Sequence, residues 1–279
     1  MVLTLVLAQP LVFAVFGDSR GNTKEAPVSP TFVKVIEAVN RTRALFAFNV
    51  GDLMLGTKDP KEGERQVETY LRIVSRSRIP VYPVMGNHDA SRGTYKPCIK
   101  RIFKGGPTFY SFDRGNCHFA VLDLYEPGHW GRLSPKQWKW LRRDLKRAQG
   151  KHIFVFLHPP LYPVDGHLKN SVHPQEVRRL SALFKECGVD IVFCGHEHLY
   201  ARLHYDGLVQ VITGGAGAPL YRPLPLERLP YERSRISFYK AERAYHFCLV
   251  EVGSNWMRLT AIALDGRVID KFALSCRHP

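Results

Sequence analysis

The sequence predicts an α/β protein in which buried strands alternate with amphipathic helices. Short runs of β-branched and aromatic residues, such as 11–16 and 45–50, each stop at a glycine-containing loop. Apolar residues at helical spacing lie between these runs, and this alternation is typical of a sheet with crossover helices. The chain has 279 residues, of which 45% are hydrophobic, and this suffices for a sizeable core. It contains no run of about 18 uncharged apolar residues, so no membrane span is expected.

The first third of the chain shows this alternation most clearly. Each predicted strand ends at a glycine followed by a polar residue, and each helical stretch has its apolar residues on one face. We expect strands at 11–16, 45–50 and 79–85, with helices around 32–39 and 67–74.

The remainder of the chain is richer in strands and is expected to join the same domain, spanning residues 1–279. Helices are expected from Ser134-Pro135 to Ala148 and at 177–184. Segment 219–243 is irregular and rich in Arg, Pro and Tyr, which is typical of a lid, a binding loop or disorder. Its arginines form either a cationic lid or a solvated loop. Strands are expected at 109–112, 118–124, 153–157, 189–194, 209–213, 247–252, 257–263 and 268–274.

The charge balance favours anionic partners. Lys and Arg number 40 against 25 Asp and Glu, so the formal net charge is +15. Such a charge suits phosphorylated small molecules, nucleic acid or membrane headgroups, or it serves solubility alone. The basic face of the helix after Ser134 is expected to be solvated.

The cysteines and the N-terminal segment bear on the cellular compartment. None of the six cysteines forms a CxxC pair, and they stand in apolar stretches, so neither a zinc finger nor a disulfide framework is expected. Segment 2–8 is apolar and resembles the tail of a signal peptide, but it lacks a positive region before it. The default expectation is therefore a cytoplasmic protein, and export would require a signal peptide that begins upstream of Met1.

Residues able to bind a metal follow five of the predicted strands. In open α/β sheets, ligand sites collect beyond the carboxyl ends of the strands. Carboxylate, amide oxygen and imidazole groups suit Zn, Mn or Fe. Each residue alone is commonly a turn, a cap or a packed side chain, but their coincidence at five strand ends predicts one metal site. These residues are Asp18, Asp52, Asn87, His158, His196 and His198.

Five motifs stand at these strand ends in a defined order. They are Gly17-Asp18, Gly51-Asp52, Gly86-Asn87-His88-Asp89, His158-Pro159-Pro160-Leu161-Tyr162 and Gly195-His196-Glu197-His198. This order resembles the calcineurin-like metallophosphoesterases, and within them the purple-acid-phosphatase-like branch, whose last motif often continues with Tyr200 and Arg202 as it does here. The motifs span residues 17–202 and are specific for the superfamily but not for the substrate.

The resemblance implies a fold and a metal centre. The fold is a four-layer α/β/β/α sandwich with two mixed β-sheets and the metal site at the carboxyl ends of the strands. The centre holds two divalent or mixed-valence ions, most often Mn, Zn or Fe. By the resemblance, Asp52 bridges the two ions, Asn87, His158 and His196 complete one position, and Asp18 and His198 complete the other.

The resemblance also implies a reaction. A bridging hydroxide attacks phosphorus in line, His88 protonates the leaving oxygen or holds a phosphate oxygen, and Asp89 orients His88. Elementary chemistry agrees, because two cations about 3.5–4 Å apart can generate hydroxide near neutral pH and hold the attacking and leaving oxygens. A histidine suits general acid catalysis because its pKa lies near neutrality.

Two positions depart from the family pattern. Many members carry His two residues after the first Asp, where this chain has Arg20, and a guanidinium cannot donate a lone pair to a metal. The purple acid phosphatases use Tyr three residues after the second Asp, where this chain has Leu55. The position completed by Asp18 and His198, which we call the first position, then keeps three protein ligands. Either water fills the gap or this position binds metal weakly. Arg20 binds substrate phosphate or a ligating carboxylate, or it is a structural arginine.

Two loops are further candidates for the pocket. The small residues of segment 214–218 follow a predicted strand, and Gly215 is expected to let the backbone approach the substrate, a plain tight turn being the alternative. Tyr125, His129 and Trp130 are candidates for the pocket mouth.

The sequence thus favours a metal-dependent phosphatase or phosphodiesterase acting on a phosphorylated small molecule. One alternative is a degenerate family member that binds metal or a phosphoryl ligand without efficient turnover, which Arg20 and Leu55 motivate. The other is a nuclease or nucleic-acid-binding protein that uses the basic helix. It is disfavoured because aromatic residues are not interleaved with the basic ones there.

Overall fold

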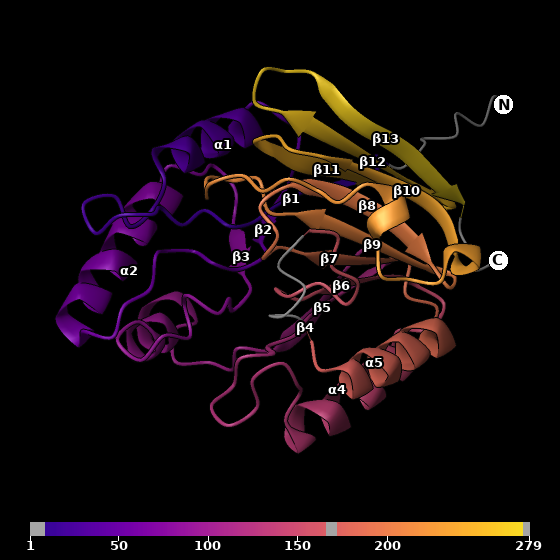
Figure 1. Ribbon diagram of the computed structural model, residues 1–279, viewed down its shortest axis with the longest axis horizontal. Helices are drawn as coiled ribbons and strands as arrows, with labels where there is room; N and C mark the ends of the chain where they lie inside the picture. The colour runs from indigo at the N-terminus through magenta and orange to yellow at the C-terminus, as the bar shows by residue number, and fades with distance from the viewer. Residues whose placement is uncertain (1–8, 166–171, 276–279) are drawn as a thin grey trace, which may run out of the picture.

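Two mixed β-sheets lie face to face between outer helices in the computed structural model, which describes residues 9–165 and 172–275 (Figure 1). The first sheet has the order β13-β12-β11-β1-β2-β3, and the second has the order β10-β8-β9-β7-β6-β5-β4. The strands of the first sheet are β1 (Leu11–Phe16), β2 (Ala47–Asn49), β3 (Val81–Pro83), β11 (His246–Val252), β12 (Trp256–Ala263) and β13 (Val268–Ser275). Those of the second are β4 (Tyr110–Arg114), β5 (Cys117–Val121), β6 (His152–Phe156), β7 (Ile191–Cys194), β8 (Tyr200–Tyr205), β9 (Leu208–Thr213) and β10 (Ile236–Glu242).

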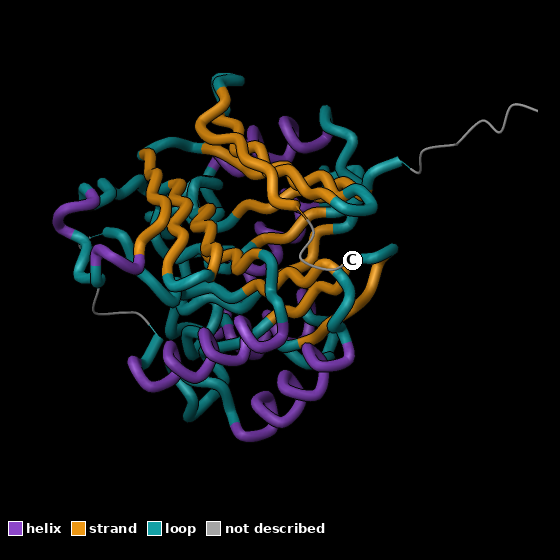
Figure 2. The backbone as a smooth tube through the Cα atoms, turned by 90° about the vertical axis from the view of Figure 1, so that its right-hand side faces the viewer, coloured by secondary structure: helices purple, strands orange, loops and turns teal. Residues whose placement is uncertain are grey.

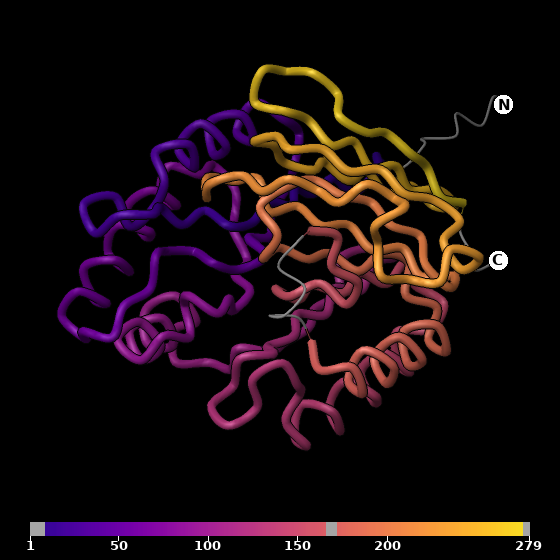
Figure 3. Tube along the Cα trace, viewed as in Figure 1, coloured from indigo at the N-terminus to yellow at the C-terminus, as the bar shows by residue number. Residues whose placement is uncertain are grey.

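Strand β1 lies near the centre of the first sheet and joins distant parts of the chain. It pairs in parallel with β2 and antiparallel with β11, so the early and late segments of the chain lie side by side, as the indigo-to-orange contrast in Figure 3 shows. In the second sheet, β5, β6, β7 and β9 run parallel to one another, while β4 pairs antiparallel with β5, β8 with β9 and β10 with β8. Both sheets are therefore mixed, as the resemblance implied.

The alternation of side chains along β1 shows how the layers are packed. Phe13 and Val15 face the space between the sheets, whereas Val12, Ala14 and Phe16 face the helices on the other side. The layer between the sheets is rich in phenylalanine. Phe48 of β2 and Phe156 of β6, for example, stack across it with ring centroids 3.7 Å apart.

The helices cover the outer faces of both sheets, outside the strand layers (Figure 2). Helices α1 (Pro30–Asn40) and α2 (Pro60–Val74) pack on the first sheet, and α4 (Pro135–Arg147) and α5 (Pro174–Cys187) pack on the second. Each starts with proline in its first turn and has a capping side chain before it: Ser29, Asp59, Ser134 and His173 respectively. This arrangement is the predicted four-layer α/β/β/α sandwich.

Two strands and several short helical segments were not expected from the sequence, among them 3-10 turns at Leu226–Arg228 and Arg233–Arg235. Strand β8 carries Arg202 and His204 at positions where an apolar residue would have marked a strand. Strand β10 lies inside segment 219–243, which was predicted to be irregular, and it pairs with β8 at the edge of the sheet. Helix α3 (Tyr95–Pro97) continues into a π-helix at Cys98–Ile102.

Segment 219–243 is bound to the second sheet by side-chain contacts. Tyr239 donates its hydroxyl hydrogen to the carbonyl of Leu224, Tyr231 donates to that of Pro163, and Arg235 pairs with Asp206. These contacts do not support a freely solvated loop.

The expectations for cysteine and for the membrane concern the described residues only. Cys98, Cys117, Cys187, Cys194 and Cys248 are buried and are not in disulfides, while Cys276 and segment 2–8 lie outside the described residues. None of the helices that the structure describes combines the length and apolar character needed to cross a membrane.

His118 makes the stability of the second sheet dependent on pH. Its Nδ1 lies 2.7 Å from Asp113 of β4 and its Nε2 lies 3.0 Å from Asp144 of α4. Burial lowers the pKa of His118, but hydrogen bonds to the two carboxylates and their charges outweigh burial and raise it. A raised folded-state pKa stabilises the fold below the unfolded value of about 6.5, and this stabilisation is lost as pH rises through the folded value.

We therefore expect His118→Gln to reduce the free energy of unfolding at about pH 6 and to have a smaller effect toward about pH 9. Urea unfolding of both proteins across this range measures the difference. His129→Gln, on a loop outside this cluster, is the control. A difference that does not change with pH would show that His118 is uncharged in the folded protein.

Candidate metal centre

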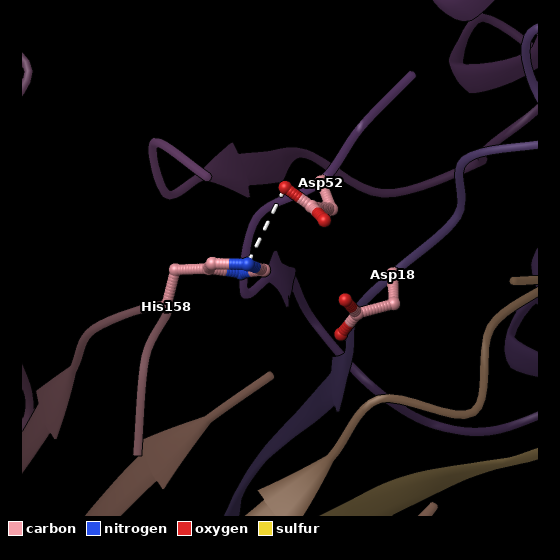
Figure 4. Close-up of side chains that lie close together, drawn as sticks. All are labelled: Asp18, Asp52 and His158. Carbon is pink, nitrogen blue, oxygen red and sulfur yellow. Dashed lines mark ion pairs between the residues drawn. The ribbon is translucent and has the colours of Figure 1, made fainter. Parts of the chain in front are cut away.

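The predicted metal ligands meet at one edge of the packed sheets. Asp18 follows β1, Asp52 follows β2 and Asn87 follows β3, and these three strands run parallel. His158 follows β6, and His196 and His198 follow β7, which is parallel to β6 in the other sheet. The carboxyl ends of both parallel groups therefore share one edge, where Asp18, Asp52 and His158 lie close together (Figure 4).

Three ionisable side chains form the buried centre of this cluster. Asp18 and His158 are 0% exposed and Asp52 is 2% exposed. A donor atom from each lies within 4.8 Å of the others, and His158 Nε2 is 3.3 Å from Asp52 Oδ1. Buried carboxylates are unfavourable unless they are paired or coordinate a cation, so this cluster fits a metal site.

Four donors converge on the side of Asp52 that faces His158. Asn87 Oδ1 lies 3.1 Å from His158 Nε2 and 3.0 Å from His196 Nδ1. Together with Asp52 Oδ1, these atoms belong to the four side chains that the resemblance assigns to one metal position, which we call the second position.

The other side of the cluster offers fewer donors. His198 Nε2 lies 3.5 Å from Asp18 Oδ1, and Asp52 contributes its second oxygen. That oxygen, Oδ2, lies 3.6 Å from Arg20 Nε and 3.8 Å from His88 Nε2. The first position would thus have three protein ligands among the described residues, with a guanidinium beside it.

Backbone carbonyls orient two of the histidines. His158 Nδ1 lies 2.8 Å from the carbonyl of Val50, and His198 Nδ1 lies 2.8 Å from that of Pro219. In both rings Nδ1 must carry a hydrogen to donate to the carbonyl, which places Nε2 on the side of the carboxylates, where a cation could bind it. Outer partners of this kind fix the tautomer of metal-binding histidines.

The backbone is strained at the ligands themselves. Asp18, Asp52 and His196 have φ values of 60°, 51° and 68°, a region that non-glycine residues rarely occupy. Gly86 and Gly195 allow the loops to approach, because a Cβ there would lie 2.4 Å from an Asp52 oxygen and 2.5 Å from an Asp18 oxygen. Strain concentrated at one buried cluster indicates a functional site.

Protonation of the cluster follows from its burial and charges. Burial lowers the pKa of His158, but the charges of Asp52 and Asp18 outweigh burial and raise it to about 9. Burial and the charge of His158 lower the pKa of His196 to about 4. Burial alone would raise the pKa of Asp52, yet His158 and His88 hold it well below its usual range. A cation bound among these groups would displace the proton from His158.

His88 lies in the cleft, as the resemblance implied, but Asp89 does not orient it. His88 lines the cleft with 30% of its side chain exposed, and its Nδ1 contacts the carbonyl of Leu55 rather than Asp89. Asp89 is fully buried and accepts hydrogen bonds from the backbone amides of Gly86 and Leu53 at 2.9 Å. Asp89 thus connects the two ligand loops, and the carbonyl of Leu55 orients His88.

Gly215 does not approach the substrate side of the centre, contrary to our expectation. A Cβ on Gly215 would lie 2.2 Å from the ring of His246, on the first sheet. The neighbouring Gly214 is the residue that faces the centre, since a Cβ there would lie 2.8 Å from an Asp18 oxygen. The expected glycine loop is present, but it approaches the metal ligands one residue earlier.

Two further residues of the site were not singled out from the sequence. Glu197 is 1% exposed, and its carboxylate accepts hydrogen bonds from the amides of Val164 and Asp165, which ties the loop after β6 to the His196–His198 turn. Tyr221 stacks on His198 with ring centroids 4.1 Å apart. The place of Glu197 between two candidate metal-binding histidines could have indicated its role. Tyr221 had no sequence signal, because its contact with His198 forms only in the folded chain.

A small cleft gives access to the centre. It has a volume of about 90 Å³ and is lined by Arg20, Asp52, Asn87, His88, His196, His198 and Tyr221. Tyr125 is buried beneath it against His158, and Trp130, 57% exposed, packs edge-on against Tyr125. A wider groove of about 610 Å³ lies on α4 among basic side chains, but no metal ligand lines it.

Two unpaired polar atoms support the fit to a bound cation and its oxygen ligands. Arg20 Nε and the Tyr125 hydroxyl are buried without a hydrogen-bond partner among the described residues. Both lie beside the ligands, Arg20 against Asp52 and Tyr125 against His158. With two strained aspartates, an amide oxygen and three imidazoles, the residues present fit divalent metal ions.

Comparison with known proteins identifies the family. The calcineurin-like phosphoesterase family pattern matches residues 12–200, which contain all six predicted metal ligands. The chain belongs to the calcineurin-like phosphoesterase family. Its relatives include acid phosphatase type 7 of Mus musculus, 26% identical over 75% of this chain and 56% of that protein. They also include the serine/threonine-protein phosphatase CPPED1 of Homo sapiens, 29% identical over 74% of this chain and 70% of that protein.

The solved structures agree on the fold. Purple acid phosphatase PPD1 from yellow lupin seeds superposes with a TM-score of 0.73 at 19% identity, over 96% of this chain and 54% of that one. The chain therefore spans about half the length of the acid phosphatases that it matches. Membership of this phosphoesterase family implies divalent metal ions.

Proposed function

We propose that the chain hydrolyses phosphate esters at a dinuclear metal centre. The observation that carries this proposal is the convergence of six predicted metal ligands from five strand ends on one largely buried cluster beside a cleft. Asp52, Asn87, His158 and His196 would hold one ion, and Asp18, Asp52 and His198 would hold the other. When bound, such ions activate a water molecule and offset the charge of the phosphoryl group.

The residues of the chain supply binding and proton transfer around these ions. His88 faces the cleft through Nε2, since its Nδ1 contacts Leu55, and it would donate a proton to the leaving oxygen. Arg20 lines the same cleft and would bind a phosphate oxygen with its unpaired Nε hydrogen. Asp89 and Glu197 hold the ligand loops in place through backbone amides.

The cleft and the relatives favour a phosphomonoester. A volume of about 90 Å³ suits a phosphoryl group, so the alcohol portion of the substrate would lie at the mouth of the cleft beside Tyr221. The names of the curated relatives, acid phosphatase and protein phosphatase, point the same way. A phosphodiester remains the second substrate class to be tested.

A binding protein without efficient turnover is the second candidate, because a guanidinium stands where many family members have a metal ligand. Elemental analysis and turnover separate the two candidates. Protein stripped with a chelator is reloaded separately with Mn, Zn, Fe, Co, Ni or Mg and assayed with p-nitrophenyl phosphate and bis-p-nitrophenyl phosphate. Turnover with at least one metal that is lost in Asn87→Ala supports the enzyme. Bound metal without turnover in any sample would refute it.

His88→Ala should discriminate between leaving groups. If His88 donates the proton, its loss should slow hydrolysis of an alkyl phosphate by about 10²- to 10⁴-fold. Hydrolysis of p-nitrophenyl phosphate should suffer less, because p-nitrophenolate leaves without protonation. Measurement of kcat for both substrates tests this expectation. An equal loss for both would assign His88 to phosphate binding instead.

A further inference from the structure

We propose that Arg20 makes the two metal positions unequal, so that one ion is retained and the other exchanges with free metal. This inference rests on the dinuclear centre of the proposed function and adds a regulatory consequence to it. Hydrolysis would follow the free metal concentration, because the weaker position fills only when metal is abundant.

The retained ion belongs to the position with four donors. Asn87 Oδ1 lies within 3.1 Å of a nitrogen of His158 and of His196, and Asp52 Oδ1 faces the same His158 nitrogen at 3.3 Å. His158 and Asp52 are almost completely buried, so they are already in place before a cation arrives. Preorganised ligands and second-shell hydrogen bonds favour tight binding.

The exchangeable ion belongs to the position beside Arg20. Its ligands are Asp18, His198 and the shared Asp52. Both oxygens of Asp18 also accept the backbone N–H of His196, at 3.1 and 2.9 Å, so its electron pairs are partly engaged. Three donors, one of them shared, bind an ion less tightly than four.

Arg20 weakens this position in a second way. Its Nε lies 3.6 Å from Asp52 Oδ2, the oxygen that must serve the first position, because Oδ1 faces His158. The guanidinium is permanently charged, so it competes with a divalent ion for this oxygen and also repels the ion.

The backbone keeps Arg20 in this place. Its N–H donates to the carbonyl of Asp52 at 2.9 Å, and its Nη1 donates to the carbonyl of Gly21 at 3.1 Å. The side chain is only 13% exposed. The charge beside Asp52 is therefore a fixed part of the site rather than a mobile surface group.

Mn²⁺ titration of chelator-treated protein tests the inference, with electron paramagnetic resonance of the free ion as the readout. The wild type should show one tight and one weak site, with dissociation constants separated by at least about tenfold. Arg20→His removes the charge and supplies a lone pair, so the two constants should approach each other. Arg20→Gln removes only the charge and should give an intermediate separation, whereas Arg20→Lys keeps the charge and should behave as the wild type.

Elemental analysis after dialysis gives an independent count of retained ions. About one ion per chain is expected for the wild type and about two for Arg20→His. Two equally tight sites in the wild type, or the same isotherm for wild type and Arg20→His, would overturn the inference. Thermal unfolding verifies that each variant is folded, and Lys34→Gln on α1 is a control for loss of a surface charge.

These measurements do not depend on turnover. Unequal metal sites in a protein that hydrolyses no phosphate ester would refute the proposed function and leave the inference intact. Turnover by a protein with two equal sites would overturn the inference and leave the proposed function intact.

Discussion

Asp52→Asn should cause the largest loss of hydrolysis of any single replacement in this chain. Asparagine keeps the shape of the side chain and can still accept the backbone N–H of His88, which lies 3.0 Å from Oδ1. It loses the negative charge that both metal positions share. Replacing a residue that merely supports a metal ligand costs about 10- to 100-fold, so loss of the shared ligand should lower kcat by more than about 100-fold. Turnover of p-nitrophenyl phosphate at saturating metal measures the effect.

Asp206→Asn is a closely matched control. Asp206 has the same φ of 51° as Asp52, but it lies between β8 and β9 and pairs with Lys185 and Arg235. The same chemical change on the same strained backbone, away from the cleft, should leave kcat within about twofold, since surface replacements have small effects. Equal losses in both variants would attribute the effect to backbone strain and not to metal binding.

The strands that position the site were predictable because each of them appears in the sequence as a run of apolar residues that the core buries. Strand β1 was predicted at 11–16 and lies at Leu11–Phe16, since apolar residues are required on both faces of a central strand. The next two strands along the chain are shorter than predicted, at Ala47–Asn49 and Val81–Pro83, because the apolar run of each extends beyond the hydrogen-bonded residues. Strand β10 was missed because an edge strand needs only one partner and its polar residues face solvent.

The clustering of the candidate ligands was predictable for a different reason. Residue type and placement at a strand end suffice to select Asp18, Asp52 and His158, because the parallel strands bring those ends together. Contacts between loops were not predictable. The pairing of Asp89 with backbone amides and the stacking of Tyr221 on His198 depend on how the loops fold over each other. The prediction that Gly215 approaches the centre was wrong by one residue for the same reason.

Tyr200 and Arg202, which continue the last metal-binding motif, act together as a structural unit. They point away from the cleft toward Asp270 of β13. The Tyr200 hydroxyl and Arg202 Nε donate to Asp270 Oδ2 at 2.7 and 2.8 Å. Arg202 also lies over the rings of Phe238 and Phe272, at 3.7 and 4.0 Å. The strand that follows the His196–His198 turn is thereby fastened to the other sheet.

We expect Asp270→Ala to reduce the free energy of unfolding by about 3–5 kcal/mol, because it leaves the guanidinium of Arg202 buried without its counter-charge. Arg202 and Asp270 have side chains that are 8% and 5% exposed, so water cannot replace the lost partner. Urea unfolding at neutral pH measures the change. Glu242→Ala, which removes a partner of the half-exposed Arg267, is the control and should cost less than about 1 kcal/mol. A loss for Asp270→Ala as small as that of the control would mean that the cation–π contacts alone hold Arg202. The metal-binding turn would then be fastened through aromatic packing rather than through the buried ion pair.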